Sequence, residues 1–267
     1  MPAPHAPVAF LLHLADSVLV LGQRNAEWCG HGPVLEEDIA MANISLDLIG
    51  QARMLYQHAA QQLGGNTTED SLAYWRDASQ FRNHSICELP HRSAFAPGVA
   101  TERDYAVTIA RNFLCSSFSL LQWQALENAS DAQLAAIAAK SVKEVRYHLR
   151  HSTDWLLRMG GGTAESGARM QAALDFLMPY TQEFWLPLEI PNATNLVAAN
   201  AHYISLAGTF ASEWQTQVAA GVAQAGLQLT AASGYLTQGK NGQHTEHLSY
   251  LLAEMQSLAR AHPGAQW

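Results

Sequence analysis

The sequence predicts an all-α protein, built as a four-helix bundle with additional peripheral helices. Apolar residues recur at the helical period along most of the chain, and no convincing alternation typical of β-strands occurs. Four of the predicted helices are about 19–29 residues long, which matches the helices of four-helix bundles. No linker divides the 267 residues cleanly, so we expect a single domain over residues 1–267.

The first two helices are predicted from their start and stop signals. Residues 8–25 form an apolar helix, with Pro7 tolerated at its very start. After a glycine-rich break, a long helix covers residues 35–63. Acidic residues occupy its first turn, where they favour the helix dipole, and Gly64 ends it.

The rest of the chain adds a short helix, a loop and further helices. A short helix is expected near residues 69–80, followed by a long loop over 81–100 that holds two prolines. Asp131 is expected to cap a long helix that Gly160 stops. The remaining helices are expected at residues 102–128, 131–159, 166–186 with a bend at Pro179, 207–225 and 245–261, and a linker at 187–195.

Composition excludes several classes of protein. The chain has 15 Lys and Arg against 23 Asp and Glu and no basic block, which argues against sequence-independent nucleic-acid binding. Three scattered cysteines make no disulfide framework, so we expect a reducing cytoplasm. The apolar stretch 8–21 is too short and polar for a membrane span and lacks the features of a signal peptide.

The low content of charged residues points to other protein chains as partners. Charged residues are 14% of the chain, against roughly 25% in typical soluble domains. We interpret this as surface covered by other subunits. The alternative is a monomer whose surface is rich in Gln, Asn and Ser.

The long helices resemble those of a dimetal carboxylate bundle but lack its ligands. Such a bundle takes a Glu from each of two helices and a Glu-x-x-His pair from each of two others, because residues three apart share one helix face. Glu88 with His91 is the one acidic residue followed by His at this spacing, and Pro90 between them argues against a helix.

The two helices expected to carry the Glu-x-x-His pairs have other residues there. In the first, Leu48 and Gln51 stand where Glu and His are needed, and in the second Val145 stands three residues before His148. We therefore predict no catalytic, cofactor-binding or metal-binding residue in this chain. The positions of the degenerate site are Asp47, Leu48, Gln51, Glu144, Val145 and His148.

An alternative is a ferritin-like metal-binding oxidase that is active in its own right. Glu144, His148 and His151 share a face of one helix, and Asp16 and Asp47 could supply further ligands. The competing interpretation is a polar network in which Lys140 pairs with Glu144.

The segment from His244 to His247 also has two interpretations. It resembles half of a zinc site, because its two histidines flank a glutamate. The favoured interpretation is that Thr245 caps the last helix.

The aromatic residues divide into expected core and expected surface. We expect Tyr74-Trp75, Phe184-Trp185 and Trp214 in the core. Trp28 and Trp267 lie near turns or ends and are candidates for anchors of a protein interface.

Several blocks of residues together resemble one family, the structural C subunits of bacterial multicomponent phenylacetyl-CoA 1,2-epoxidases (phenylacetate-CoA oxygenases). The resemblance runs nearly from end to end of the chain. The blocks are Gly22-Gln23-Arg24, Glu27-Trp28-Cys29-Gly30-His31 with Pro33, Leu46-Asp47-Leu48 with Gly50-Gln51-Ala52-Arg53, Lys143-Glu144 with Arg146-Tyr147-His148-Leu149-Arg150, Gly239-Lys240, His244-Thr245-Glu246-His247-Leu248, Leu252-Ala253-Glu254-Met255-Gln256, and Pro263-Gly264 with Gln266-Trp267.

The resemblance implies a ferritin-like fold and a non-catalytic role in a cytoplasmic complex of phenylacetate catabolism. It implies pairing with a homologous catalytic subunit that holds a di-iron centre. A small B subunit and a reductase with FAD and a 2Fe-2S cluster would complete the system and deliver electrons from NADPH. The catalytic subunit would then epoxidise the ring of phenylacetyl-CoA, with no cofactor in this chain.

Overall fold

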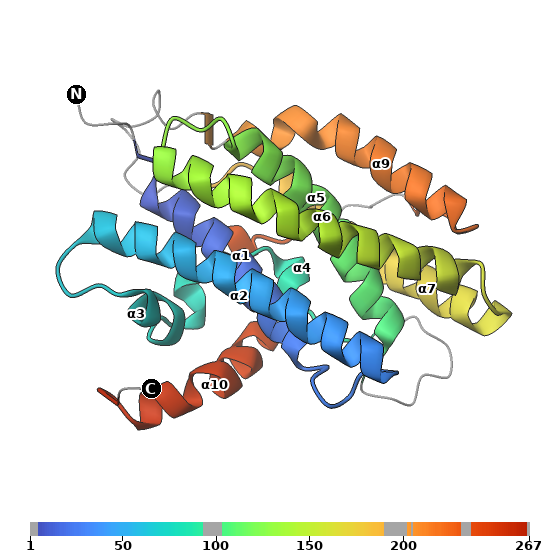
Figure 1. The fold of residues 1–267 in the computed structure, drawn as a ribbon, viewed down its shortest axis with the longest axis horizontal. Helices are drawn as coiled ribbons and strands as arrows, with labels where there is room; N and C mark the ends of the chain where they lie inside the picture. The colour runs from blue at the N-terminus through green and yellow to red at the C-terminus, as the bar shows by residue number, and fades with distance from the viewer. Residues whose placement is uncertain (1–4, 93–102, 190–201, 204, 231–235, 266–267) are drawn as a thin grey trace. The chain divides into compact units, whose positions relative to one another are not determined.

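The computed structural model describes residues 5–92, 103–189, 202–203, 205–230 and 236–265 (Figure 1). Within these ranges the regular structure is helical, and the β-structure is one isolated bridge between Gln238 and Gln243. This confirms the predicted all-α, ferritin-like bundle class. The four predicted long helices are present as α1 (Val8–Ala26), α2 (Leu35–Leu63), α5 (Tyr105–Leu126) and α6 (Ala132–Gly160).

The helices group into two compact units, and each is described by itself. The α1–α2 unit comprises the described parts of residues 2–89, 188–196 and 238–267. The α5–α6 unit comprises the described parts of residues 90–187 and 197–237. The single domain over residues 1–267 stays a prediction.

The α1–α2 unit is organised around two long helices that pack along each other. Gly22 of α1 makes this packing close, because a Cβ placed there would lie 3.1 Å from the Cβ of Leu48 and 3.3 Å from the carbonyl oxygen of Ser45. Leu11 and Leu55 are fully buried in the core. The smaller elements of this unit are α3 (Glu69–Tyr74), η1 (Ala78–Gln80), α4 (Ser85–Glu88), η5 (Gly239–Asn241) and α10 (Glu246–Ala261).

Two side chains of α10, the last helix, donate to backbone oxygens at and just after the end of α3. The amide of Gln256 donates to the carbonyl oxygens of Ala73 (3.2 Å) and Arg76 (3.0 Å). The guanidinium of Arg260 donates to the oxygens of Tyr74 (3.2 Å) and Arg76 (3.1 Å). These bonds satisfy carbonyl groups at the end of α3 that have no partner within the helix.

The α5–α6 unit packs its own pair of long helices and adds shorter ones at their side. The carboxylate of Asp131 accepts from the backbone N–H groups of Gln133 and Leu134, so it caps α6 as predicted. Five aromatic rings cluster in this unit: Phe118, Phe184, Trp185, Phe210 and Trp214. Its shorter elements are α7 (Ala164–Leu177), η2 (Met178–Trp185), η4 (Leu206–Phe210) and α9 (Ala211–Gln224).

Three predicted segments differ from the structure. The helix expected near 69–80 is two elements, α3 and η1, and the loop expected at 81–100 contains the short helix α4 in its described part. The helix expected over 166–186 changes to a 3₁₀-helix at Met178. Pro179 has no N–H to donate, so the α-helical ladder cannot continue through it.

The exposure of two tryptophans is the reverse of the prediction. Trp28, expected at an interface, is buried with 5% of its surface exposed, whereas Trp75, expected in the core, is 47% exposed. Position relative to a turn therefore did not predict tryptophan exposure. Trp267 lies outside the described residues.

Candidate functional site

Two of the three degenerate-site positions of α2 are buried. Leu48 is 4% exposed, and its Cβ is the atom that Gly22 of α1 faces most closely. Gln51, one turn further along, is fully buried, while Asp47 is half-buried. Leu48 offers no atom that can bind a metal.

On α6, the apolar side chain of Val145 lies where a dimetal bundle needs a carboxylate, next to the polar Glu144 and His148. Val145 is 1% exposed and His148 is 2% exposed. Glu144 is half-buried, and its carboxylate lies 3.6 Å from the ammonium nitrogen of Lys140, as the competing interpretation predicted. The hydroxyl of Ser152 donates to the backbone oxygen of His148 at 2.9 Å. The α2 and α6 positions belong to different units, so a network joining Asp47, Gln51, Glu144 and His148 stays a prediction.

Asp16 of α1, a further ligand of the oxidase alternative, is fully buried and already held by four donor groups from three residues. Its Oδ2 accepts from the backbone N–H of Arg82 (2.7 Å) and from Nη1 of Arg76 (3.1 Å), and a second guanidinium nitrogen contacts Oδ1. The phenol of Tyr56 donates to Oδ1 at 2.5 Å. These donors leave the carboxylate of Asp16 neutralised inside the α1–α2 unit.

The pKa values of Tyr56 and Arg76, the two side chains that donate to Asp16, are both raised. Burial and the nearby Asp16 carboxylate raise the pKa of Tyr56 well above 10, so the phenol keeps its proton and donates it. Burial by itself lowers the pKa of Arg76, but the contributions of Asp16 and Tyr56 together raise it by more, and the guanidinium stays charged. The guanidinium carbon of Arg76 also lies 4.4 Å from the ring centroid of Phe81, a cation–π contact.

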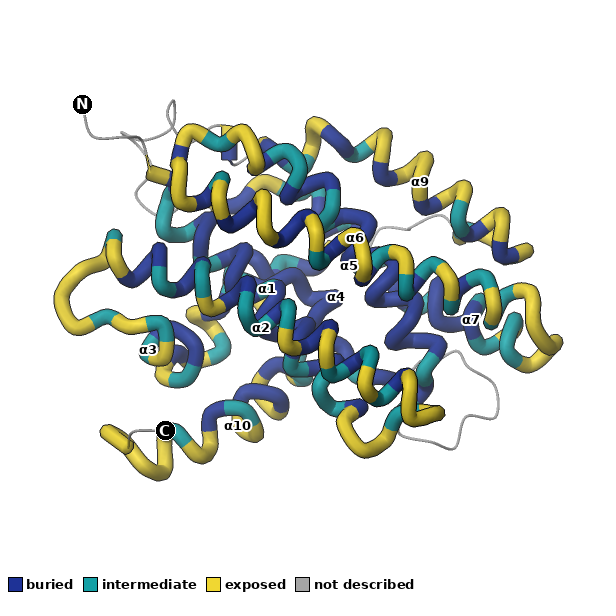
Figure 2. Tube along the Cα trace, viewed as in Figure 1, coloured by how far each residue is buried: buried dark blue, intermediate teal, exposed yellow. Residues whose placement is uncertain are grey.

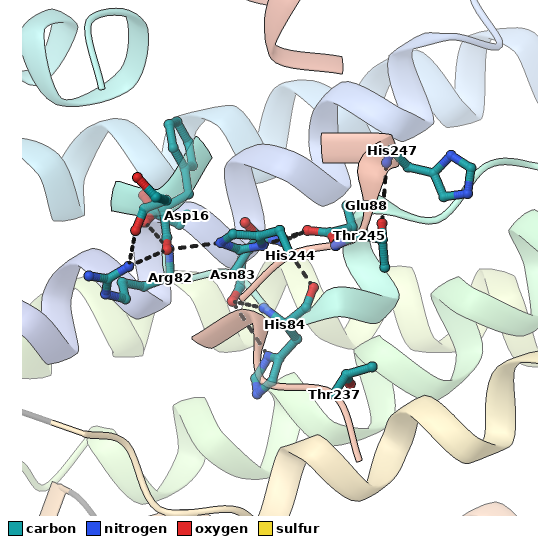
Figure 3. Close-up of polar contacts among 12 residues, drawn as sticks. Asp16, Arg82, Asn83, His84, Glu88, Thr237, His244, Thr245 and His247 are labelled. Atoms are coloured by element: carbon teal, nitrogen blue, oxygen red, sulfur yellow. Dashed lines mark hydrogen bonds and ion pairs between the residues drawn. The ribbon is translucent and has the colours of Figure 1, made fainter. Parts of the chain in front are cut away.

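A second buried cluster centres on Glu88, which is fully buried at the end of α4 (Figure 3). Its Oε1 accepts from the backbone N–H of Thr245 at 2.6 Å, and its Oε2 accepts from the side-chain amide of Asn83 at 2.8 Å. Nδ1 of His244 lies 2.8 Å from the same Oε2. The backbone oxygen of Glu88 accepts two bonds from the guanidinium of Arg24, at 2.7 and 3.0 Å.

Both ring nitrogens of His244 face oxygen acceptors. Nδ1 faces the Glu88 carboxylate, and Nε2 lies 3.0 Å from the backbone oxygen of Phe81. A neutral imidazole carries one proton, so the two contacts require a proton shared with the carboxylate. Both ring nitrogens of His244 are therefore engaged with oxygen atoms of the protein rather than directed at a metal.

Thr245, within the His244–His247 segment, lies at the N-cap of α10. The hydroxyl of Thr245 accepts from the backbone N–H of His247, so Thr245 caps α10 (Figure 3). This confirms the capping interpretation that the sequence favoured over half of a zinc site. With His244 paired to Glu88, the segment joins α10 to α4.

Two further histidines in the α1–α2 unit are buried as neutral bases. The rings of His13 and His84 meet edge to face with centroids 4.6 Å apart, and Nδ1 of His13 donates to the backbone oxygen of Arg82 at 2.6 Å. Burial and then the charge of Lys240 lower the pKa of His13 to about 3, against the carbonyl of Arg82, which raises it. Burial, His13 and Lys240 likewise lower the pKa of His84.

A glycine allows the chain to bring Lys240 to this cluster. A Cβ on Gly239 would lie 2.5 Å from the backbone oxygen of Asn83, so only a residue without a side chain fits the start of η5 there. Gly239, Lys240 and His244 lie in recognisable blocks of the sequence, but the local spacing does not predict which residues they meet. Glu88 was considered only as the partner of His91.

The described helices include none that is long and apolar enough to cross a membrane.

Comparison with known proteins covers nearly the whole chain. The family model described as "Phenylacetic acid catabolic protein" matches residues 3–267. The chain is similar to the curated C subunit of the 1,2-phenylacetyl-CoA epoxidase of Escherichia coli (strain K12). The two are 43% identical over 260 residues, which cover 97% of this chain and 98% of the relative. The chain therefore belongs to the phenylacetic acid catabolic protein family.

Proposed function

We propose that this chain is a non-catalytic structural subunit of a phenylacetyl-CoA ring 1,2-epoxidase complex, and that it supports a di-iron catalytic subunit. The observation that carries the proposal is the burial of Leu48 and Val145, two apolar side chains at positions where a dimetal bundle needs carboxylates. The 43% identity to the C subunit of an epoxidase supports the assignment to this kind of complex.

The residues near these positions do not fit a di-iron centre. Two iron ions need several carboxylates to offset their charge, and buried apolar groups cannot do so. Of the acidic candidates, Asp16 is neutralised by Arg76, and Glu144 lies beside Lys140. We therefore assign no metal, no cofactor and no catalytic residue to this chain, and derive no chemical step from it.

The cofactors and partners belong to the rest of the complex in this proposal. The di-iron centre lies in a homologous catalytic subunit, which activates O₂. A small B subunit and a reductase carrying FAD and a 2Fe-2S cluster complete the system, with NADPH as the electron source. This chain acts in the cytoplasm as part of that assembly. The low charged fraction, 14%, supports a surface made for protein contacts.

Metal analysis of the isolated chain tests the non-catalytic role. After reconstitution with ferrous iron under anaerobic conditions, we expect no stoichiometric iron, because the ligand positions are apolar. Two irons per chain would instead support the alternative, a ferritin-like oxidase that uses Asp16, Asp47, Glu144 and His148.

Reconstitution of activity tests the supporting role. With phenylacetyl-CoA, NADPH and reductase, the chain alone should give no epoxide, while its addition to the catalytic subunit should restore or raise turnover. The proposal fails if the catalytic subunit turns over equally well and stays equally soluble without this chain.

A further inference from the structure

The exposed side of α6 is basic although the chain as a whole is acidic. This helix carries five Lys and Arg against two Asp and Glu, whereas the rest of the chain carries ten against 21. Of the three lysines in the chain, Lys240 is buried, and the two exposed ones, Lys140 and Lys143, both lie on α6. One helix therefore has a net positive charge on a chain that is otherwise negative.

Three of the cations on α6 and one aromatic ring share a face of the helix. Lys143, Arg146 and Arg150 follow a spacing of three and four residues, so they lie along one line, and Tyr147 lies beside them. We call these four residues the α6 basic patch. All four are exposed, Tyr147 by 40%, and Figure 2 shows exposed positions recurring along α6. The patch extends roughly 10 Å along the helix at 1.5 Å per residue.

The α6 basic patch has no counter-charge in the described part of the chain. Glu144, the acidic residue within the patch segment, is half-buried and lies 3.6 Å from Lys140, outside the patch. Among the described residues, none forms an ion pair with Lys143, Arg146 or Arg150. Like charges four residues apart, such as those of Arg146 and Arg150, destabilise a helix slightly. An acidic surface placed over the patch would remove this repulsion.

The aromatic ring in the patch favours a protein as the source of that acidic surface. The guanidinium carbon of Arg150 lies 5.6 Å from the ring centroid of Tyr147, a cation–π contact between two exposed side chains. Tyr and Arg are the residue types enriched at protein interfaces and among the residues that dominate their binding energy. A second copy of this chain is disfavoured, since each copy has a net charge of −8 and the two repel each other.

The size of the α6 basic patch favours a partner that docks transiently. A permanent subunit interface buries about 2,000 Å² or more and is rich in apolar residues. The patch is short and mostly charged, which suits the smaller interfaces of electron-transfer partners, at about 1,200 Å² or less. Opposite charges speed the encounter of such partners and lose their effect as salt screens them.

We propose that the α6 basic patch is the docking site for an acidic surface of the reductase that delivers electrons to the complex. The inference rests on the proposed function, which supplies the reductase, and adds the docking surface and the charge that the reductase presents to it. Lys143, Arg146 and Arg150 attract carboxylates of that surface, and Tyr147 packs against it.

The test uses the reconstituted epoxidase and varies the reductase concentration, at about 50 mM and about 500 mM salt. For each variant of the full-length chain it measures the half-saturating reductase concentration and the maximal rate. Lys143→Glu, Arg146→Glu and Arg150→Glu each reverse one charge, and Arg146→Lys keeps the charge. Arg158→Glu is the matched control, because Arg158 is an exposed cation of the same helix whose guanidinium carbon lies 5.3 Å from the ring of Trp155.

The half-saturating reductase concentration should rise in the charge-reversal variants, while the maximal rate should not change. At low salt each reversal in the patch should raise this concentration about five-fold or more, because it weakens the attraction that steers the encounter. At high salt the variants and the parent chain should converge, because the charges are screened. Arg146→Lys and Arg158→Glu should stay within about two-fold of the parent chain at both salt concentrations.

Three results in the activity assay would overturn the inference. Equal half-saturating concentrations for the parent chain and the three reversals would mean that the reductase docks elsewhere. A lower maximal rate at an unchanged half-saturating concentration would give the patch a structural role, as would loss of helical circular dichroism in all three reversals. Inhibition of the parent complex by inorganic phosphate beyond that of chloride at equal ionic strength, absent in the reversals, would make the patch a site for small anions.

Two further results concern the partner and the proposed function. A parent chain that sediments as a dimer, which Arg146→Glu dissociates, would replace the reductase by a second copy. If the parent chain supports no epoxidation at any reductase concentration, the proposed function fails together with the inference. Support of epoxidation with a reductase dependence that the reversals leave unchanged refutes the inference alone.

Discussion

Asp16 illustrates how single residues determine what the α1–α2 unit can hold. A carboxylate on a long bundle helix is a potential metal ligand when its sequence neighbours are considered alone. In the structure it forms a buried ion pair with Arg76, supported by Tyr56 and by the backbone N–H of Arg82. Removal of one partner from such a pair leaves an uncompensated buried charge, which is far costlier than loss of an exposed pair.

Asp16→Asn should therefore lower the free energy of unfolding by about 3–5 kcal/mol, because the guanidinium of Arg76 remains buried without its counter-charge. Urea denaturation followed by circular dichroism measures the change. The exposed Asp154 of α6 provides the control, and Asp154→Asn should alter stability by less than about 0.5 kcal/mol. Equal effects of the two substitutions would contradict the structural role of Asp16.

The buried histidines predict a dependence of stability on pH. His13 has a pKa of about 3 in the folded chain, below its usual value of 6.5. Between these values the unfolded chain binds a proton that the folded chain does not, so the free energy of unfolding falls as the pH falls from 6.5 towards 3. His13 contributes up to about 1.4 kcal/mol per pH unit to this slope.

Unfolding measured at several pH values between 6.5 and 4 tests this contribution. In His13→Gln the slope should be shallower by about one proton, whatever the stability of the variant at pH 7. The exposed His262 is the control, and His262→Gln should leave the slope unchanged. A parallel shift of the whole curve in His13→Gln would show that His13 does not titrate on unfolding.

At the scale of elements, α10 is held at both of its ends. Thr245 caps its first turn, and Glu88 of α4 accepts from the Thr245 N–H. Gln256 and Arg260 bind the carbonyl oxygens that end α3. The element is therefore defined by contacts to segments about 160–180 residues earlier in the chain, as well as by its own apolar face.

Thr245→Ala should lower the free energy of unfolding by about 1 kcal/mol, because the N–H of His247 loses its acceptor. Thermal unfolding should report a lower melting temperature. The matched control is Thr216→Ala on the exposed side of α9, where the hydroxyl caps no helix end and a change near zero is expected. No difference between the two variants would contradict the capping role.

Leu48, at a position where a dimetal bundle needs a ligand, is buried where α1 packs against α2. A Cβ placed on Gly22 of α1 would lie only 3.1 Å from the Cβ of Leu48, and the side chain of Leu48 is 4% exposed. Leu48→Glu would restore a ligand type but place an unpaired carboxylate in this interior, at a cost of about 3 kcal/mol or more.

Denaturant unfolding at pH 7 measures this cost, with Leu48→Met as the control of similar volume, expected to lose less than about 1.5 kcal/mol. The destabilisation by Leu48→Glu should diminish at pH 4, because a protonated carboxyl is less costly to bury. Stability equal to the parent chain at pH 7, without added metal, would mean that this position tolerates a charge.

For the whole molecule, the comparisons show the family, and the structure shows where the described chain exposes large apolar residues. The family model covers nearly the entire chain, and the relative of 43% identity is one subunit of a named epoxidase. Most of the large apolar residues that the described chain exposes lie in the α1–α2 unit, including Leu35 and Leu46 of α2.

The sequence by itself determined the helical class, the span of the four long helices and the absence of Glu-x-x-His pairs in them. These properties depend on local signals, namely helical periodicity, the cap at Asp131 and the identity of residues three apart. The broken helix at Pro179 and the short α4 were placed less well, because local preferences for α-helix, 3₁₀-helix and turn differ little there.

Only the tertiary structure decided which polar residues meet. Arg76 reaches Asp16 across 60 positions and His244 reaches Glu88 across 156, and neither spacing leaves a periodic signal in the sequence. The same holds for Trp28 and Trp75, whose exposure depends on what packs over them. Burial makes these pairings obligatory, because a charged or polar group removed from water must find its partner wherever the fold brings one.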